Sequence, residues 1–202
     1  NTIQTLSSSV WGKNADGSTI EQWLKEFGAD GARGSRGRLH ALYLLSRFMF
    51  FGADEIRDLL RCLFRDHFKY PIVARVRRQA ADTSDPAVLD AAFSFALKHT
   101  RFLGMGNPSE SGTHLLYLFR QENGLSKEQF IGAHEVFNLT QPVPSLADPA
   151  ITRYVFIDDF CGSGQQAVQY SSGPVAGMKA AAAAAGVRIN VAYHVLLATR
   201  KG

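Results

Sequence analysis

The stretch Tyr154–Ala167, with the sequence YVFIDDFCGSGQQA, decides the predicted fold of this chain. Its first four residues are apolar, and they are followed by Asp158 and Asp159, a Gly-Ser-Gly turn and a helix-compatible segment. This order predicts a buried strand that ends in two acids and a loop that leads into a helix. Open α/β sheets bind ligands at the carboxyl ends of their strands, so the stretch also predicts a ligand site. An ordinary strand–turn–helix with two solvated acids is the alternative interpretation.

The residue types after this strand suit a phosphorylated sugar. Glycine allows backbone N–H groups to approach a phosphate closely, and the start of a helix adds unpaired N–H donors. The carboxylates of Asp158 and Asp159 are acceptors for ribose hydroxyls and for the water shell of Mg²⁺.

The stretch resembles the signature of type I phosphoribosyltransferases, in which four apolar residues precede two acids and a short glycine-containing loop. The resemblance implies that Asp158 and Asp159 are catalytic, that they orient the ribose of phosphoribosyl pyrophosphate, and that they hold Mg²⁺ through water. It implies that the 5′-phosphate is held by a phosphate loop of five residues, namely Gly162, Ser163, Gly164, Gln165 and Gln166. The two glutamines depart from the family pattern, which usually has a glycine and a hydroxyl residue at these places.

A second loop supports the same resemblance. Within Phe102–Arg120, loop-forming residues precede an apolar pattern that predicts a helix, and small hydroxyl residues and glycine at a helix start suit an anion. In phosphoribosyltransferases the pyrophosphate loop occupies this place, which implies a pyrophosphate-binding segment made of Ser109, Glu110, Ser111 and Gly112. A plain helix cap is the alternative. Together the two motifs resemble the phosphoribosyltransferase-like domains of bacterial conflict systems, which defend against phage.

The resemblance implies a glycosyltransferase-type effector that binds phosphoribosyl pyrophosphate or a related nucleotide and transfers or cleaves at ribose C1. The family often closes a basic loop over pyrophosphate, and Asn138–Thr152 contains neither Lys nor Arg. The first alternative is therefore a non-catalytic nucleotide- or partner-binding module of a defence complex. The second is an S-adenosylmethionine-dependent methyltransferase, because Asp159–Gly164 also resembles the D-P-F-x-G-S-G loop of DNA amino-methyltransferases. The second motif of those enzymes is matched only weakly, by Gly106–Ser109.

Composition places the chain among ordinary globular proteins. It has 202 residues, of which 46% are hydrophobic and 20% charged, and a formal net charge of +4. No run of 18 apolar residues exists, so no membrane span is expected. Cys62 and Cys161 have no metal-type spacing, and reduced thiols in a cytoplasmic protein are the default expectation.

Hydrophobic patterns predict a mainly helical region over residues 1–98 and a phosphoribosyltransferase-like α/β domain with a parallel sheet over residues 99–202. Helices are expected at Thr19–Phe27, Leu39–Phe51, Asp54–Phe68, Ile72–Ala81, Pro86–His99, Thr113–Gln121 and Lys127–Phe137. A further helix is expected from Gln165 onward, with an interruption at Ser171–Pro174. Strands are expected at Arg101–Met105, Arg153–Ile157 and Arg188–Leu197. Because Ile189–Ala198 reads as a buried strand so near the last residue, we expect a sheet that is incomplete at the C-terminus.

Arg57, Arg61 and Arg65 recur at four-residue spacing and therefore share one face of a helix. The acids of Met49–His67 are too few to neutralise this face, which predicts a partner outside the chain. A protein is the expected partner. Nucleic acid is the alternative, because basic stripes also follow phosphate backbones.

Overall fold

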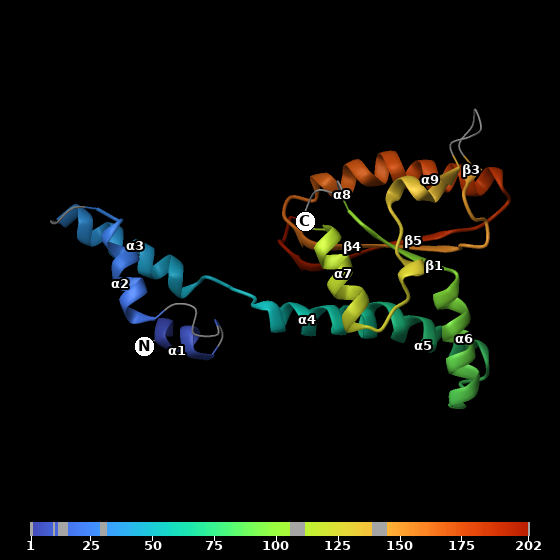
Figure 1. Ribbon diagram of the computed structural model, residues 1–202, viewed down its shortest axis with the longest axis horizontal. Helices are drawn as coiled ribbons and strands as arrows, with labels where there is room; N and C mark the ends of the chain where they lie inside the picture. Colours follow the sequence, from blue (N-terminus) through green and yellow to red (C-terminus); the bar gives the residue numbers. More distant parts are fainter. Residues whose placement is uncertain are drawn as a thin grey trace. The chain divides into compact units, whose positions relative to one another are not determined.

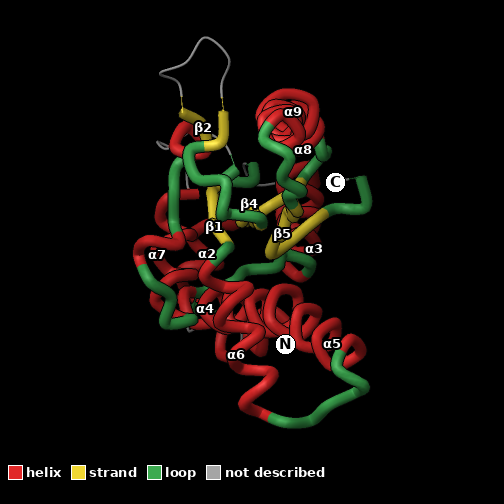
Figure 2. Tube along the Cα trace, turned by 90° about the vertical axis from the view of Figure 1, so that its right-hand side faces the viewer, coloured by secondary structure: helices red, strands yellow, loops and turns green. Residues whose placement is uncertain are grey.

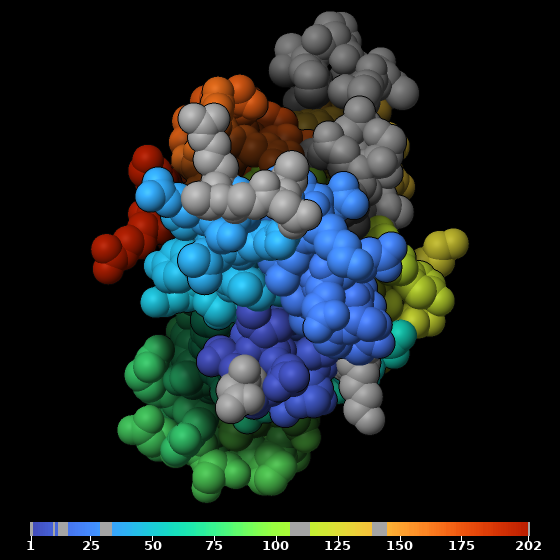
Figure 3. Space-filling view, turned by 90° about the vertical axis from the view of Figure 1, so that its left-hand side faces the viewer, coloured from blue at the N-terminus to red at the C-terminus, as the bar shows by residue number. Residues whose placement is uncertain are grey.

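The computed structural model describes residues 2–9, 11, 16–28, 32–105, 112–138 and 145–201. The chain divides into two compact units, residues 1–56 and 57–202, whose elements are traced in Figure 1. The first unit contains α1 (Thr2–Ser9), α2 (Gly17–Lys25) and α3 (Ala32–Ser46), and part of its surface is seen as blue spheres in Figure 3. The predicted helix at Thr19–Phe27 is confirmed as α2, which begins after Asp16 because this side chain accepts a hydrogen bond from the N–H of Thr19 at 2.8 Å.

The second unit holds both the sheet and the helices from Arg57 onward. We predict that the phosphoribosyltransferase-like domain begins at residue 99, and this boundary stays a prediction. Among the described helices, none is long and apolar enough to cross a membrane.

A single helical run leads into the second unit. It comprises α4 (Ala53–Cys62), a π-helical turn η1 (Leu63–Lys69) and α5 (Tyr70–Gln79). The expectation of two helices separated before Pro71 is wrong. Proline lacks an N–H and clashes with the carbonyl four residues earlier in a regular α-helix. Just before Pro71 the hydrogen bonds shift to the π pattern, with the N–H of Tyr70 donating to the carbonyl of Arg65, and the chain stays helical.

The helix after the predicted motif also contains a proline. Here α8 (Gln165–Tyr170), the π-helical turn η4 (Ser171–Val175) and α9 (Ala176–Ala184) follow one another directly, with Pro174 inside η4. The expected interruption at Ser171–Pro174 is therefore a change of helical pattern. The run ends at Gly186, whose φ of 68° suits the left-handed position after a helix.

Three parallel strands form the main sheet in the order β1-β4-β5, which confirms the predicted α/β class. They are β1 (Thr100–Gly104), β4 (Arg153–Cys161) and β5 (Asn190–Ala198), and β4 extends four residues beyond the predicted strand end. α6 (Pro86–Lys98) precedes β1, and α7 (Gly112–Glu122) follows it. In the described chain β5 pairs with β4 alone, so its interior residues are half-buried, where we expected a buried strand.

Helices cover both faces of this sheet, as Figure 2 shows, with α8 and α9 on one side and α4 and α5 on the other. Successive strand residues point to opposite faces, so Phe102 and Leu103 enter different clusters. Phe102 is fully buried among the rings of Phe68, Phe119 and Phe130, with centroid distances of 5.1, 5.3 and 5.4 Å. On the other face, the apolar cluster of α9 contains Leu103, Tyr154, Phe156, Met178, Ala181 and Ala182.

The helix predicted at Lys127–Phe137 is wrong. The segment forms two 3-10 turns, η2 (Lys127–Gln129) and η3 (Ala133–Val136), and β2 (Phe137–Asn138), which pairs antiparallel with β3 (Ser145–Leu146). Tertiary contacts override the helical pattern here. Phe130 forms a parallel bridge to Phe102, and the N–H of Ile131 donates to the carbonyl of Phe102 at 3.2 Å, which requires extended backbone.

Candidate functional site

Asp158 lies on the central strand β4, one residue beyond the point where β1 ends. Gly104, the last residue of β1, is in register with Ile157, whereas β5 accompanies β4 as far as Cys161. The Asp158 carboxyl group is fully engaged within the chain. Its Oδ2 accepts a hydrogen bond from the Tyr193 hydroxyl at 2.9 Å, and its Oδ1 accepts one from the N–H of Asp159 at 3.0 Å.

Burial gives Asp158 unusual acid–base properties. Only 8% of the residue is exposed, and burial raises the pKa of Asp158 above its ordinary value, although the bond from Tyr193 acts in the opposite direction. Burial and the carboxylate together raise the pKa of Tyr193, so the phenol keeps its proton and acts as the donor. A buried carboxyl group with a raised pKa at the carboxyl edge of a sheet is a candidate functional group.

Asp159 occupies a different environment. Because side chains alternate along a strand, Asp158 shares the α9 face with Tyr154 and Phe156, while Asp159 points to the opposite face. Asp159 is half-buried, in contrast to its neighbour. A ligand that meets both carboxyl groups must therefore approach from the rim of the sheet, where the two faces meet.

The predicted phosphate loop follows β4 directly. Gly162, Ser163 and Gly164 form a bend, and Gln165 and Gln166 are the first two residues of α8. Gly164 has a φ of 74°, a left-handed conformation that favours glycine and that turns the chain into the helix. Both glutamine side chains are exposed, and the N–H of Gln165 lies 3.4 Å from the Ser163 Oγ that accepts from it.

Two residues that sequence reasoning missed hold this motif from β5 and its end. Tyr193 bonds to Asp158, and Thr199 bonds to the loop through its hydroxyl, which donates to the carbonyl of Gly162. Neither residue belongs to a recognisable motif. The alternation of β5 indicates which residues share a face with Tyr193, but only the register of β5 against β4 places its hydroxyl beside the acid.

The predicted pyrophosphate-binding segment is described only at its end. Ser109, Glu110 and Ser111 lie outside the described residues, and Gly112 is the first residue of α7. The chain leaves β1 at Gly104, beside the residue that precedes Asp158. The chain thus leaves β1 at the same edge of the sheet as the acids, and the role of the predicted segment stays a prediction.

The donor set at this edge suits a hydrated Mg²⁺ better than a metal held by protein alone. Among the described residues, His, Cys, Asp and Glu do not gather in any group of three or more that could hold a metal ion. Mg²⁺ is typically bound through one or two carboxylates together with water and substrate phosphates. Asp158 and Asp159 fit that pattern as oxygen donors.

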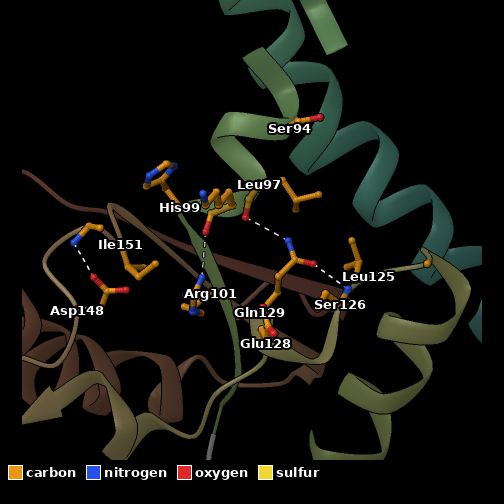
Figure 4. A pocket seen from close by; sticks show the side chains of 13 residues that line it. Ser94, Leu97, His99, Arg101, Leu125, Ser126, Glu128, Gln129, Asp148 and Ile151 are labelled. Atoms are coloured by element: carbon orange, nitrogen blue, oxygen red, sulfur yellow. Dashed lines mark hydrogen bonds between the residues drawn. The ribbon is translucent and has the colours of Figure 1, made fainter. Parts of the chain in front are cut away.

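A cavity of about 510 Å³ lies at the opposite, amino end of the strands (Figure 4). Its lining includes His99 at the end of α6, Arg101 near the start of β1, Ile151 just before β4, and Gln129 from η2. Arg101 donates to the carbonyls of Lys98 and Thr100 at 3.1 and 3.0 Å, so its guanidinium holds backbone in place. The cavity includes none of the predicted site residues, and the carboxyl edge remains the better candidate because the acids and the loop converge there.

The arginine stripe is neutralised within the chain. Glu122 of α7, with 11% of its side chain exposed, accepts from Arg57 at 3.2 Å and from Arg61 at 2.9 Å. Arg61 also pairs with Asp58, and Arg65 pairs with Asp66 at 2.7 Å. The expectation that acids are too few is wrong, because Asp58 and Asp66 of the same segment pair with two of the arginines and Glu122 of a distant helix adds a third acid. The arginines link α4 to α7, and the predicted external partner stays a prediction.

One comparison with known proteins finds a match. A family model described as PRTase-CE, a phosphoribosyltransferase-like domain, matches residues 20–202. The match includes the whole sheet, the acids and the loop. No curated protein and no solved structure matches the chain.

Proposed function

The chain belongs to the PRTase-CE family, and from this membership we propose that the carboxyl edge of its sheet binds phosphoribosyl pyrophosphate or a related nucleotide. The proposed reaction breaks a bond at ribose C1 of the bound ligand and transfers the ribosyl group to an acceptor or to water. The proposed setting is a bacterial anti-phage defence system, in which the domain acts as the effector.

A single arrangement supports this proposal most strongly. The central strand β4 carries Asp158 and Asp159, and within three residues it enters the loop that begins at Gly162. A ribose 5-phosphate has its hydroxyls and its phosphate at opposite ends of one small ring. Acids followed closely by a loop that offers backbone N–H donors match that spacing of acceptors and donors.

In the proposed reaction the bond between ribose C1 and a pyrophosphate oxygen breaks, and a bond from C1 to an acceptor or to water forms. The leaving oxygen keeps the bonding electron pair, so positive charge develops on the ribose. The carboxylates of Asp158 and Asp159 orient the hydroxyls and stabilise this charge, which favours the transition state over the ground state. The loop Gly162–Gln166 holds the 5′-phosphate, and Ser109–Gly112 is the proposed contact for pyrophosphate.

Mg²⁺, when bound, supplies the positive charge that stabilises the departing pyrophosphate. Asp158 and Asp159 are proposed to hold it through water, in keeping with their role as oxygen donors. Of the two, Asp159 is the more accessible, because it is half-buried whereas Asp158 is buried.

Isothermal titration of the whole chain with phosphoribosyl pyrophosphate, with and without Mg²⁺, tests the proposal. Losing a charge-assisted contact at Asp159→Asn should weaken binding by about 1.5–3 kcal/mol, or about 10- to 150-fold. Asp90→Asn, at an exposed acid of α6, is the matched control. Combining Asp158→Asn with Asp159→Asn should abolish binding. Unchanged affinity in that double variant would remove the basis of the proposal.

Two further titrations test the loop and the competing ligand. Gly164→Val should abolish binding, because valine disfavours the left-handed backbone and fills space near the phosphate, whereas Gln166→Thr should preserve or strengthen it. S-adenosylmethionine should not bind. Binding of that ligand in place of phosphoribosyl pyrophosphate would identify a methyltransferase-type site.

A non-catalytic binding module is the second candidate function, and one observation favours it. The Asp158 carboxyl group is buried, and both of its oxygens already accept hydrogen bonds within the chain, which leaves it less available to a ribose. The two functions differ in a measurable product. Release of pyrophosphate from phosphoribosyl pyrophosphate indicates the enzyme, and tight binding without release indicates the module.

A further inference from the structure

The segment after β5 is bonded to the start of the phosphate loop and is itself braced by a third hydrogen bond. The N–H of Thr199 donates to the carbonyl of Cys161 at 3.0 Å, which continues the pairing of β4 with β5 by one step. The hydroxyl of Thr199 donates to the carbonyl of Gly162. The same hydroxyl oxygen accepts a hydrogen bond from the N–H of Lys201 at 3.2 Å.

These bonds determine the orientation of one peptide plane. In a trans peptide the carbonyl of one residue and the N–H of the next point in opposite directions. Because Thr199 holds the carbonyl of Gly162 on the side of β5, the N–H of Ser163 must point away from β5. Among the described residues, none accepts a hydrogen bond from this N–H. Within the described part of the chain it is an unpaired donor, and the bond from Thr199 sets its direction.

The glycines of the loop do little by themselves to fix the orientation of the peptide between Gly162 and Ser163. Gly162 has no side chain, and Gly164 has a left-handed backbone. Glycine is the residue that rotates most freely about its backbone, so a single hydrogen bond at Gly162 has a large effect on the direction of the next N–H. The bond from Lys201 polarises the Thr199 hydroxyl and strengthens its donation.

We propose that Thr199 is a positioning residue of the phosphate loop: its hydroxyl orients the Gly162–Ser163 peptide so that the N–H of Ser163 donates to a phosphoryl oxygen of the ligand. The inference rests on the proposed function, since it takes the ligand to be a phosphorylated ribose. Thr199 itself does not touch the ligand.

Three variants of the whole chain separate this role from general loss of structure. Thr199→Val keeps the shape of the side chain and removes the hydroxyl, while Thr199→Ser keeps the hydroxyl. Thr152→Val is the matched control, because Thr152 is exposed and its hydroxyl has no hydrogen bond among the described residues. Circular dichroism spectra establish that all three variants fold.

The first measurement needs no ligand. Cys161 is buried and directly precedes Gly162, whose carbonyl accepts from the Thr199 hydroxyl, so its alkylation by iodoacetamide reports on opening at this point when that hydroxyl is removed. Mass spectrometry separates it from Cys62, which serves as the internal reference. We expect Thr199→Val to accelerate alkylation of Cys161 several-fold and Thr199→Ser to leave it near the wild-type rate. Equal rates in the wild type and Thr199→Val would overturn the positioning role.

The second measurement is the dissociation constant for phosphoribosyl pyrophosphate and for ribose 5-phosphate. One hydrogen bond is worth about 0.5–1.5 kcal/mol net, so Thr199→Val should raise the dissociation constants of both ligands by about 2- to 13-fold. Thr199→Ser should restore the wild-type values. Wild-type binding that Thr199→Val leaves unchanged refutes the further inference alone. A wild-type chain that binds neither ligand refutes the proposed function, and the inference fails with it.

Discussion

Removing the Tyr193 hydroxyl is the most direct test of how the chain holds its buried acid. In Tyr193→Phe, Oδ2 of Asp158 loses a donor at 2.9 Å while only 8% of the residue is exposed to water. A hydrogen bond to a charged group contributes about 1.5–3 kcal/mol to stability. For a chain of this size 1 kcal/mol corresponds to a shift of about 2–4 °C, so the melting temperature should fall by about 3–12 °C.

The same substitution in an Asp158→Asn background should cost less, because asparagine forms a neutral hydrogen bond with Tyr193. That bond is worth about 0.5–1.5 kcal/mol, and the melting temperature should fall by about 1–6 °C. The difference between the two backgrounds is the coupling energy between the phenol and the charge. Tyr70→Phe, on an exposed tyrosine of α5, should change nothing.

Thermal unfolding followed by far-ultraviolet circular dichroism measures these shifts. The chain has two tryptophans, Trp11 and Trp23, and both lie in residues 1–56, so tryptophan fluorescence follows the first unit separately. That signal should not respond to Tyr193→Phe. Equal losses in the wild-type background and in the Asp158→Asn background would refute the reasoning, because the hydroxyl would then not act through the charge.

The sign of the pH dependence follows from the same group. Burial raises the pKa of Asp158 above the ordinary 3.8, so over the interval just above 3.8 the folded chain keeps a proton that the unfolded chain has released. Stability therefore falls as the pH rises through that interval. Asp158→Asn cannot titrate, and melting temperatures measured across the interval should show that it lacks this fall.

Three further outcomes are expected. Burial and the nearby His67 lower the pKa of His194 below the ordinary 6.5. As the pH falls below 6.5 the unfolded chain therefore binds a proton at a higher pH than the folded chain does, and stability is lost. The melting temperature of His194→Leu should fall less between about pH 7 and pH 5 than that of the wild type. Glu122→Gln should lower the melting temperature because it weakens the link from α7 to two arginines, whereas the same change at exposed Glu128 should not. Equal effects would show that the pairs with Glu122 do not stabilise the fold. Phe102→Ala should cost about 3–5 kcal/mol in urea unfolding, since it opens a cavity in a fully buried aromatic cluster, and a cost under about 1 kcal/mol would mean that the cluster collapses to refill it.

Local sequence was sufficient where neighbouring residues determine the conformation. The strand that includes Tyr154–Ile157 and the helix that begins at Pro86, after the cap that Asp85 forms, both follow from residues within a few positions of one another. The chemistry of the motif was readable for the same reason, because Asp158, Asp159 and the loop lie on one continuous segment.

Contacts between distant segments accounted for the errors. Lys127–Phe137 has a helical pattern, yet Phe130 pairs with Phe102 and the chain is extended there. Arg57 reads as an uncompensated charge because its acid, Glu122, comes from another helix. In both cases the partner is far away in the sequence, and a local pattern contains no information about it.

The sequence by itself determined the chemical groups of the candidate site and the strand that bears them, since these depend on residue identity and on local periodicity. Tertiary structure alone decided the state of those groups. The register of β5 against β4 places the Tyr193 hydroxyl on Asp158 and the Thr199 hydroxyl on Gly162. The register of a parallel pair is set by packing on both faces of the sheet, and for that reason it emerges only when the whole chain is folded.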